Sequence, residues 1–129
     1  MNIISTDTYK IRFKDEGYAH LNELVASNNY TNFYVLVDEN TKKLCLTTFK
    51  EKVSFKFEII EIKSGEIHKN LDTCLDVWNH LTNKNADRNS LLINWGGGVI
   101  TDMGGFIAST YKRGIDFVNI PTTLLSMVD

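Results

Sequence analysis

Short apolar runs rich in β-branched and aromatic residues alternate with segments of helical periodicity along most of this chain. The strand-like runs lie at residues 9–13, 32–38, 55–62, 91–93 and 115–120. Between them, apolar residues recur at helical spacing around Leu21, Leu44, Leu71 and Met103. Strands that alternate with helices of about ten residues indicate βαβ units. We therefore expect a Rossmann-like α/β fold, with an open, mainly parallel sheet and helices on both of its faces.

Three consecutive glycines, Gly96, Gly97 and Gly98, join the apolar run at 91–93 to the clearest helical pattern in the chain. Open α/β sheets bind ligands beyond the carboxyl ends of their strands, where the strand order switches. Glycines there let backbone N–H groups approach an anion, and the helix N-terminus adds favourable partial charge. We expect a diphosphate at this turn, and a merely structural turn stays open as the alternative. The G-x-G-x-x-G fingerprint is not met, because Thr101 stands at its third glycine.

The helix after the glycines is expected to have two faces. The core face comprises Met103, Phe106, Ile107 and Thr110, and a small-residue stripe comprises Gly105, Ala108 and Ser109. Asp102 is expected in the first helical turn. Its carboxylate there either complements the helix dipole or accepts hydrogen bonds from cofactor hydroxyls, and the pattern does not separate these roles.

Charge and hydropathy exclude several classes of partner. A net charge of −2 and a pI of about 5.9 give no electrostatic basis for binding nucleic acid or an anionic membrane. No stretch approaches the ~18 consecutive apolar residues of a membrane span, and the first residues lack the features of a signal peptide. A disulfide between Cys45 and Cys74 stays open, but we expect reduced, buried thiols in a cytoplasmic protein.

The last residues of the chain are strongly apolar. Leu124, Leu125, Met127 and Val128 directly precede Asp129. Large apolar side chains are usually buried, and a natural domain seldom ends on four of them. We expect truncation of a longer protein, with a C-terminal helix docked on the sheet as the alternative.

Residues 96–129 carry three motifs in order. These are Gly-Gly-Gly-Val-Ile-x-Asp, Gly-Phe-x-Ala-x-Thr-Tyr-x-Arg-Gly and Pro-Thr-Thr-Leu-Leu-x-x-Val-Asp. Together they resemble the signature region of the 3-dehydroquinate synthase family. Two upstream segments, 37–40 (Val-Asp-Glu-Asn) and 65–69 (Gly-Glu-Ile-His-Lys), resemble the strand-end motif and the nucleotide loop of that family. The resemblance implies that residues 1–129 are a truncated N-terminal NAD-binding domain without the C-terminal helical metal-binding domain.

The resemblance also implies roles for individual residues. The adenine and ribose side of NAD would be contacted by Asp38, Glu39, Asn40, Glu66 and Lys69. The diphosphate would be cradled by Gly96, Gly97 and Gly98, and the remaining cofactor groups would be held by Asp102, Thr122 and Thr123. The substrate would be contacted by Arg113 and Asp129.

Two of these assignments have structural alternatives. The guanidinium of Arg113 suits a phosphate or carboxylate, but a solvated cation at a helix end is an equal reading. For Thr122 and Thr123, the alternative is helix N-capping after Pro121.

Three residues depart from the pattern of the family. Thr101 replaces the usual glycine before Asp102, and Ser64 replaces an aspartate that commonly precedes the Gly-Glu pair. Trp95 is bulkier than the small or aliphatic residue usual before the glycines. NAD binding is still implied, and the side chains of Thr101 and Trp95 are the two that could block it.

Enzymes of this family convert 3-deoxy-D-arabino-heptulosonate 7-phosphate, a phosphorylated seven-carbon keto acid, to 3-dehydroquinate and phosphate. This lyase step belongs to the shikimate pathway of aromatic amino-acid biosynthesis. NAD acts transiently, and a divalent metal, zinc or cobalt, acts as a Lewis acid. The parent protein would be a homodimer. Since His20, His68 and His80 show no metal-ligand spacing, we expect no metal site in this chain and no activity from it alone.

Two alternatives to this function stay open. The first is another sugar-phosphate cyclase or a metal-dependent polyol dehydrogenase, which share the nucleotide-binding fold. The context of Arg113 and the Pro-Thr-Thr segment at 121–123 favours cyclases over dehydrogenases. The second is a non-catalytic α/β binding module of flavodoxin-like outline, which would not bind NAD.

Overall fold

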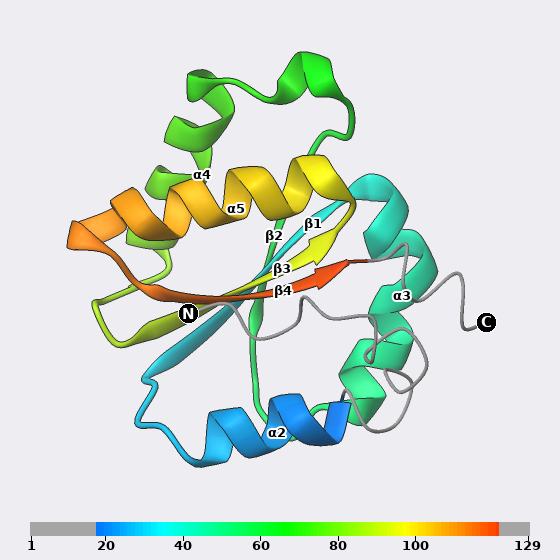
Figure 1. Ribbon diagram of the computed structural model, residues 1–129, viewed down its shortest axis with the longest axis vertical. Coiled ribbons are helices and arrows are strands. Elements are labelled where there is room, and N and C mark those ends of the chain that lie inside the picture. Colours follow the sequence, from blue (N-terminus) through cyan, green and yellow to red (C-terminus); the bar gives the residue numbers. More distant parts are fainter. Residues whose placement is uncertain (1–17, 122–129) are drawn as a thin grey trace.

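The computed structural model of the chain describes residues 18–121, apart from the side chains of residues 44–46, 48 and 121. Within this range four parallel strands form one sheet in the order β2-β1-β3-β4 (Figure 1). The strands are β1 (Asn32–Asp38), β2 (Glu58–Ile62), β3 (Ser90–Gly96) and β4 (Asp116–Pro121). The predicted α/β fold with an open parallel sheet is confirmed.

Most of the predicted strands are found, with different bounds. The run at 32–38 is β1, the run at 91–93 extends to all of β3, and the strand predicted at 9–13 lies outside the described residues. The run at 55–62 is a strand only from Glu58. Phe55 packs edge-on against Phe33, with ring centroids 4.7 Å apart, and Phe57 packs against Phe49 at 5.0 Å. Both rings therefore serve the core before the strand begins.

Between residues 18 and 121 there are four α-helices and two short 3-10 helices, and all but the first of them lie between strands. They are α2 (Tyr18–Ala26), α3 (Glu39–Lys52), η2 (Glu66–His68), α4 (Leu71–Asn83), α5 (Gly98–Thr110) and η3 (Tyr111–Arg113). Side chains cap two of the helices. Asp38 accepts a hydrogen bond from the backbone N of Thr41 at 2.8 Å, and Asn70 accepts one from the backbone N of Thr73 at 2.9 Å. Each cap pairs an amide that has no partner within its own helix.

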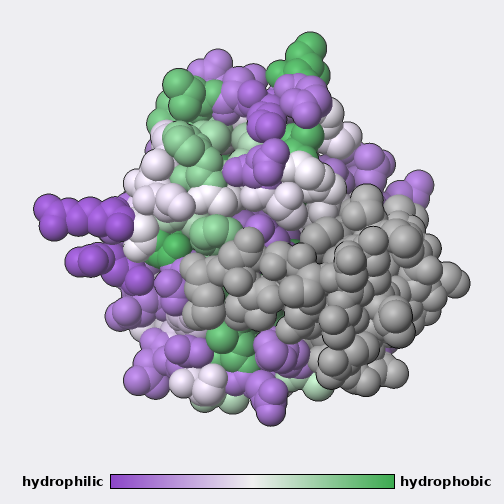
Figure 2. Space-filling model, viewed as in Figure 1, coloured by the Kyte–Doolittle hydropathy of each residue, from purple (hydrophilic) through white to green (hydrophobic). Residues whose placement is uncertain are grey.

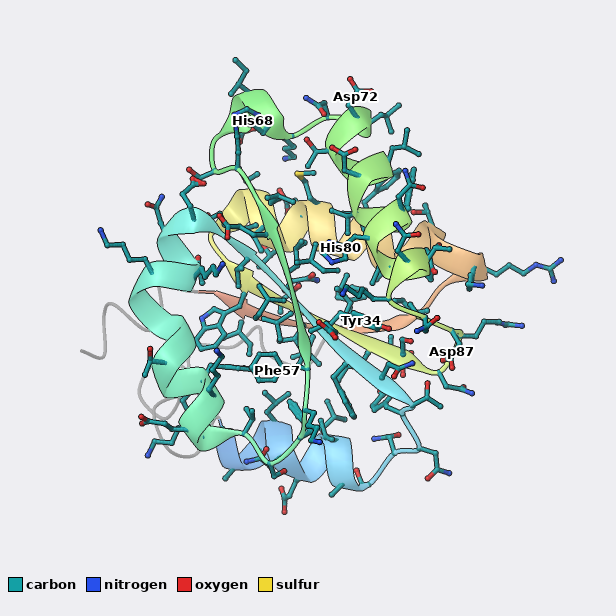
Figure 3. All side chains as sticks on the ribbon, turned by 180° about the vertical axis from the view of Figure 1, so that it is seen from behind. Tyr34, Phe57, His68, Asp72, His80 and Asp87 are labelled. Carbon is teal, nitrogen blue, oxygen red and sulfur yellow. The ribbon has the colours of Figure 1, made fainter. Side chains whose placement is uncertain are left out.

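Helices cover both faces of the sheet, as expected (Figures 1 and 3). On one face, α2 and α3 pack through Tyr18, Leu21 and Phe49 against buried side chains of the central strands. On the other face, α4 and α5 form a second core with the alternate side chains of the same strands. This core contains Tyr34, Leu36, Ile60, Leu92, Cys74, Val77, Leu81, Ile100, Met103 and Ile107. Because helices cover both faces of the sheet, a ligand has access at the carboxyl ends of the strands.

The predicted core face of α5 is wrong in part. Met103 and Ile107 are buried, but Phe106 is 47% exposed and Thr110 is exposed. Ala108, predicted in the small-residue stripe, is fully buried. The side of α5 that carries Gly104 and Ala108 faces the sheet, and these small residues let the helix lie close to it. Hydropathy alone favours a phenylalanine over an alanine at a core position, so Phe106 was wrongly assigned to the core.

The helical stripe predicted for α4, which comprises Leu71, Leu75, Trp78 and Leu81, is also wrong in part. Its buried residues are Cys74, Val77 and Leu81, whereas Leu71 and Leu75 are exposed.

Cys74 is a free thiol, and burial raises its pKa. Ile67, Leu71 and Leu75 are exposed, and Figure 2 shows hydrophobic surface in the upper part of the molecule, where η2 and α4 lie in Figure 1. None of the helices between residues 18 and 121 has the length and apolar character that crossing a membrane requires.

Candidate functional site

The strand order switches direction between β1 and β3. From β1 the chain crosses through α3 to β2 on one side, and from β3 it crosses through α5 to β4 on the other. Such a switch point is where open α/β sheets bind ligands, outside the carboxyl ends of the strands. Asp38 ends β1 and Gly96 ends β3, and the register pairs Leu36 with Asn94. The two predicted cofactor segments, 38–40 and 96–98, therefore meet at one edge of the sheet.

The three glycines differ in what surrounds them. A Cβ atom on Gly96 would lie 2.6 Å from Cβ and Cγ1 of Ile100, so packing excludes any side chain there. A Cβ on Gly97 or Gly98 would meet nothing within 4 Å among the described residues. None of the three has the left-handed backbone conformation that favours glycine. Within the described part of the chain, neither packing nor backbone strain therefore accounts for Gly97 and Gly98, and no described atom fills the space beside them.

Gly97 is the N-cap of α5 and supplies no side-chain acceptor to the first helical amides. These amides also lack intrahelical partners, and the helix dipole places positive partial charge beside them. An anion seated against Gly97 and Gly98 would satisfy these donors, as phosphates do at other helix N-termini.

Neither of the two bulky departures fills this space. Trp95 is fully buried on the opposite side, where its ring lies 4.4 Å from that of Phe49 and 6.3 Å from that of Tyr18. The hydroxyl of Thr101 donates to the carbonyls of Gly98, at 3.2 Å, and Gly97, at 3.4 Å. The threonine side chain is thus folded back on its own helix.

At the end of β1, Glu39 is held by Ser64. Its carboxylate accepts from the backbone N of Ser64 at 2.7 and 3.1 Å and from the Ser64 hydroxyl at 2.7 Å. These hydrogen bonds, that of the backbone N first and that of the hydroxyl second, lower the pKa of Glu39. The amide of Asn40 adds a longer contact to the same hydroxyl, at 3.5 Å. A serine can donate to Glu39, whereas the aspartate usual here in the family would repel it.

The loop after β2 carries the other predicted nucleotide residues toward α5. Gly65 has a φ of 106°, a conformation that favours glycine, and η2 follows it. Lys69 reaches from the end of this loop to Asp102 of α5, with Nζ 3.2 Å from Oδ2. A hollow of about 350 Å³ adjoins the pair and is lined also by Leu71, Cys74, Met103 and Phe106. The structure thus brings Lys69 and Asp102 together across 33 residues of sequence.

Asp102 does not lie in the first turn of α5, contrary to expectation. The helix begins at Gly98 and its first turn contains no acidic residue. Asp102 is therefore not an N-cap. Its ionic partner is Lys69, and its side chain is 66% exposed.

Arg113 lies in η3, beyond the far end of α5 from the glycine turn (Figure 1). The 13 residues of α5 separate the two positions by about 20 Å. Arg113 therefore does not line the glycine turn, and its contact with substrate stays a prediction. Thr122, Thr123 and Asp129 lie outside the described residues.

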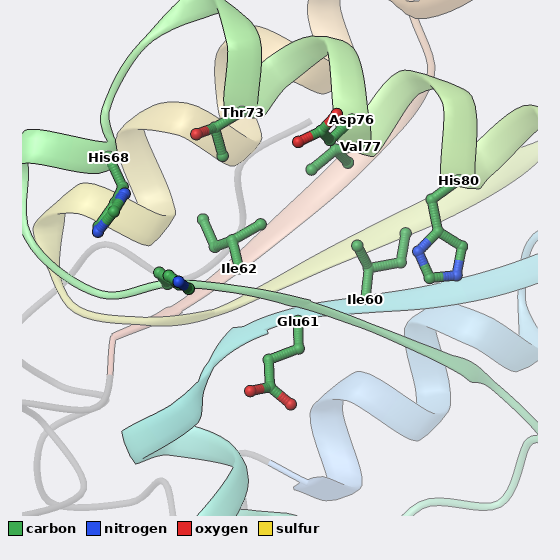
Figure 4. A pocket seen from close by; sticks show the side chains of 9 residues that line it. Ile60, Glu61, Ile62, His68, Thr73, Asp76, Val77 and His80 are labelled. Atoms are coloured by element: carbon green, nitrogen blue, oxygen red, sulfur yellow. The ribbon is translucent and has the colours of Figure 1, made fainter.

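The histidines lie on three different elements: His20 on α2, His68 in η2 and His80 on α4. His68 and His80 line a second hollow of about 350 Å³ between β2 and α4 (Figure 4). Ile60 and Ile62 of β2 line the same hollow. No three His, Cys, Asp or Glu side chains within the described part of the chain are placed to hold a metal ion.

The sequence reasoning missed two polar features near the site. Ser64 was noted only as a departure, although it is the partner of Glu39. Asn94 and Asn119 were passed over, although their side chains are hydrogen-bonded at 3.1 Å beneath the glycine turn. The available signal was an asparagine inside each of two otherwise apolar strands.

Comparison with known proteins gives a consistent family match. The family described as 3-dehydroquinate synthase N-terminal matches residues 59–129. The 3-dehydroquinate synthase of Parabacteroides distasonis is 42% identical over 112 residues, which cover 86% of this chain and 32% of the relative. The 3-dehydroquinate synthase of Campylobacter jejuni subsp. doylei is 43% identical over 122 residues, which cover 93% and 35%. The chain spans about a third of the length of the curated relatives it matches.

A solved structure supports the same relationship at the level of the fold. The 2-epi-5-epi-valiolone synthase of Streptomyces hygroscopicus subsp. jinggangensis, with NAD+ and Zn2+ bound, is similar with a TM-score of 0.69 and 26% identity. The similarity covers 82% of this chain and 30% of that one.

Proposed function

Since the chain belongs to the 3-dehydroquinate synthase N-terminal family, we propose that it is the NAD-binding portion of a 3-dehydroquinate synthase. The observation that carries the proposal is the open space beside Gly97 and Gly98, at the switch point of the sheet. Glycine there leaves room that no other described residue uses, next to uncapped helix amides. A diphosphate fits both the space and the charge. The related valiolone synthase, with NAD+ bound, supports the choice of dinucleotide.

The residues around the switch point would divide the cofactor between them. Gly97 and Gly98 would hold the diphosphate, with Gly96 shaping the turn. Lys69 and Asp102 flank the same edge and would hold ribose hydroxyls, as would Glu66 in the adjoining loop. One carboxylate oxygen of Asp38 accepts a hydrogen bond from the backbone N of Thr41, and the other oxygen would accept one from the cofactor. When bound, NAD supplies an acceptor for the hydride of a substrate carbinol.

Glu39 and Asn40 would act at one remove from the cofactor. Their side chains contact Ser64, which begins the loop that carries Glu66 and Lys69. We therefore assign Glu39 to holding that loop against α3. This role is favoured over the predicted contact of Glu39 with adenosine, because both oxygens of Glu39 already accept hydrogen bonds.

The activity proposed for the whole enzyme is conversion of 3-deoxy-D-arabino-heptulosonate 7-phosphate to 3-dehydroquinate and phosphate. The identity to curated synthases over most of the chain supports this choice of substrate. The divalent metal, zinc or cobalt, and the helical domain that binds it are proposed for a full-length homodimeric enzyme. Contacts of Arg113 and Asp129 with substrate remain predictions, as do those of Thr122 and Thr123 with the cofactor.

Titration of the 129-residue chain with NAD and with ADP-ribose tests the proposal. We expect binding heat, and amide NMR shifts at residues 97–102 with either ligand. A folded sample that shows neither at millimolar ligand would contradict it and would favour a non-catalytic binding module. In a phosphate-release assay with the heptulosonate phosphate, we expect no turnover from this chain alone. Turnover by a pure sample would show that the described site is more complete than proposed.

A sister sugar-phosphate cyclase is the second candidate. The observation in its favour is the structural similarity to a valiolone synthase at 26% identity. The identity of 42–43% to 3-dehydroquinate synthases favours the synthase. Assay of a full-length enzyme with the heptulosonate phosphate and with a seven-carbon sugar phosphate that lacks its carboxylate separates the two.

A further inference from the structure

Two asparagines lie among the apolar side chains of the strands beneath the glycine turn. Asn94 of β3 is fully buried, and its Nδ2 donates to Oδ1 of Asn119 on β4 at 3.1 Å. The same two residues are partners in the parallel register. Oδ1 of Asn94 is buried and has no hydrogen-bond partner among the described residues. A buried amide oxygen without a partner is destabilising, so its place two residues before Gly96 requires a reason.

The side-chain amide of Asn94 faces Gly104, in the middle of α5. A Cβ atom on Gly104 would overlap Oδ1, Cγ and Nδ2 of Asn94. The Cβ position is where one Hα of a glycine points, so a C–H of Gly104 faces the unpaired oxygen. This is a weak hydrogen bond at most. The geometry nevertheless shows that the backbone of Gly104 packs directly on the amide of Asn94. This contact sets the distance between α5 and the sheet.

In dinucleotide-binding turns the third glycine of G-x-G-x-x-G permits close packing of the helix on its strand. Thr101 occupies that place here, and its hydroxyl is bonded to its own helix. Gly104 supplies the close approach instead, about 9 Å along the helix from Gly98. A helix is stiff over this length, so a displacement at Gly104 moves the amides at the helix start.

We propose that Asn94, Asn119 and Gly104 form a seat that fixes the height of α5 on the sheet and thereby positions the amides of residues 97–100 for a diphosphate. These three are positioning residues, because none of them touches the ligand. The proposal rests on the function proposed above.

Three variants of the full chain test the seat. Gly104→Ala places a methyl group on the amide of Asn94, and Asn94→Ala combined with Gly104→Ala removes that amide again. Asn119 is only half-buried, so water can replace its lost partner in the double variant. Gly105→Ala is the matched control on the next residue of the same helix. Among the described residues, its Cβ would meet only ring carbons of Phe117 at 3.6 Å, an ordinary contact.

Two measurements are made on each variant: amide NMR shifts of residues 97–101 without ligand, and the affinities for adenosine and ADP. We expect Gly104→Ala to move those shifts and to lower the preference for ADP over adenosine by about tenfold. The double variant should restore both, and Gly105→Ala should change neither. Adenosine has no diphosphate, so a general loss of structure would weaken both ligands together and leave the preference unchanged.

Wild-type shifts and wild-type preference in Gly104→Ala would overturn the seat, as would a double variant that restores neither. If Gly104→Ala does not fold, a folded double variant with the wild-type preference supports the seat, and an unfolded one refutes it. If the wild-type chain binds ADP no better than adenosine, the proposed function fails. The ligand-free shifts then decide by themselves whether the three residues position the start of α5.

Discussion

Four glycines, two just before or at the start of α5 and two that pack closely, fall into pairs with opposite surroundings. The packed glycines, Gly96 and Gly104, lie where a Cβ would collide with Ile100 and with Asn94. The open glycines, Gly97 and Gly98, have no described atom within 4 Å of a Cβ position. Packing explains the first pair completely and the second pair not at all.

This difference separates two reasons for which a chain uses glycine. At a packed position any side chain must displace a neighbour, and the effect appears in stability. At Gly98, the first residue of α5, glycine is less stabilising than alanine. Since no described residue accounts for this cost, it supports the proposed ligand that approaches the backbone.

The largest effect on stability is expected when a side chain is added to one of the packed glycines. In Gly96→Ala the new methyl group lies 2.6 Å from side-chain atoms of Ile100, which is 2% exposed and has little room to move. Overpacking of this kind costs about 1–3 kcal/mol. Urea unfolding measures the cost, and Gly98→Ala, at the first residue of α5, is the matched control at an open position. Equal stabilities for the two variants would remove the distinction between the pairs.

The open pair should respond in ligand binding. Gly98→Ala adds a better helix former at the first helical position, so the free energy of unfolding should stay the same or rise by up to ~1 kcal/mol. Affinity for ADP should fall about tenfold, because the methyl group occupies the space proposed for the diphosphate. Urea unfolding measures the change in stability, and calorimetry measures the affinity for ADP, with adenosine as the ligand that lacks the diphosphate. A stabilised variant that binds ADP like the wild type would show that the space has no ligand.

The order of elements and the place of the glycine turn could be predicted, because strand and helix periodicities are local properties of the sequence. The surroundings of the glycines could not. The contact of Gly104 with Asn94 depends on how closely α5 lies on the sheet, and the spacing of residues along the sequence does not reveal that distance. The same closeness buries Ala108 and leaves Phe106 exposed, against their hydropathies.

The polar contacts of the site were equally out of reach of the sequence. Glu39 meets Ser64 across 25 residues, and Lys69 meets Asp102 across 33. A family motif indicated that these side chains matter. Only the folded chain shows which of them hold each other.

A smaller, pH-dependent effect is expected from Glu39, which holds the loop beside the open pair. Because its pKa is lowered in the folded chain, its stabilising contribution is present above the pKa of an unfolded glutamate. The contribution is lost as the pH falls through the lowered folded value. The difference in unfolding free energy between wild type and Glu39→Gln should therefore shrink from about pH 6 to about pH 3.

Ser64→Ala supplies the comparison for that series. It removes the hydroxyl donor and keeps the backbone N–H, so it should retain part of the pH-dependent difference. A difference between wild type and Glu39→Gln that is constant with pH would show that the carboxylate charge does not hold the loop.

The smallest effect on stability should come from the ion pair of Lys69 and Asp102, which spans the open side of the turn. Its side chains are 38% and 66% exposed, and exposed pairs contribute about 0–1 kcal/mol. A double-mutant cycle with Lys69→Met and Asp102→Asn should thus give a coupling in unfolding that disappears at high salt. Both single variants should nevertheless bind ADP-ribose more weakly than wild type. If the two residues served the fold alone, the loss would appear in unfolding and not in binding; weakened binding at unchanged stability places them, with Gly97 and Gly98, on the side of the turn that serves the ligand.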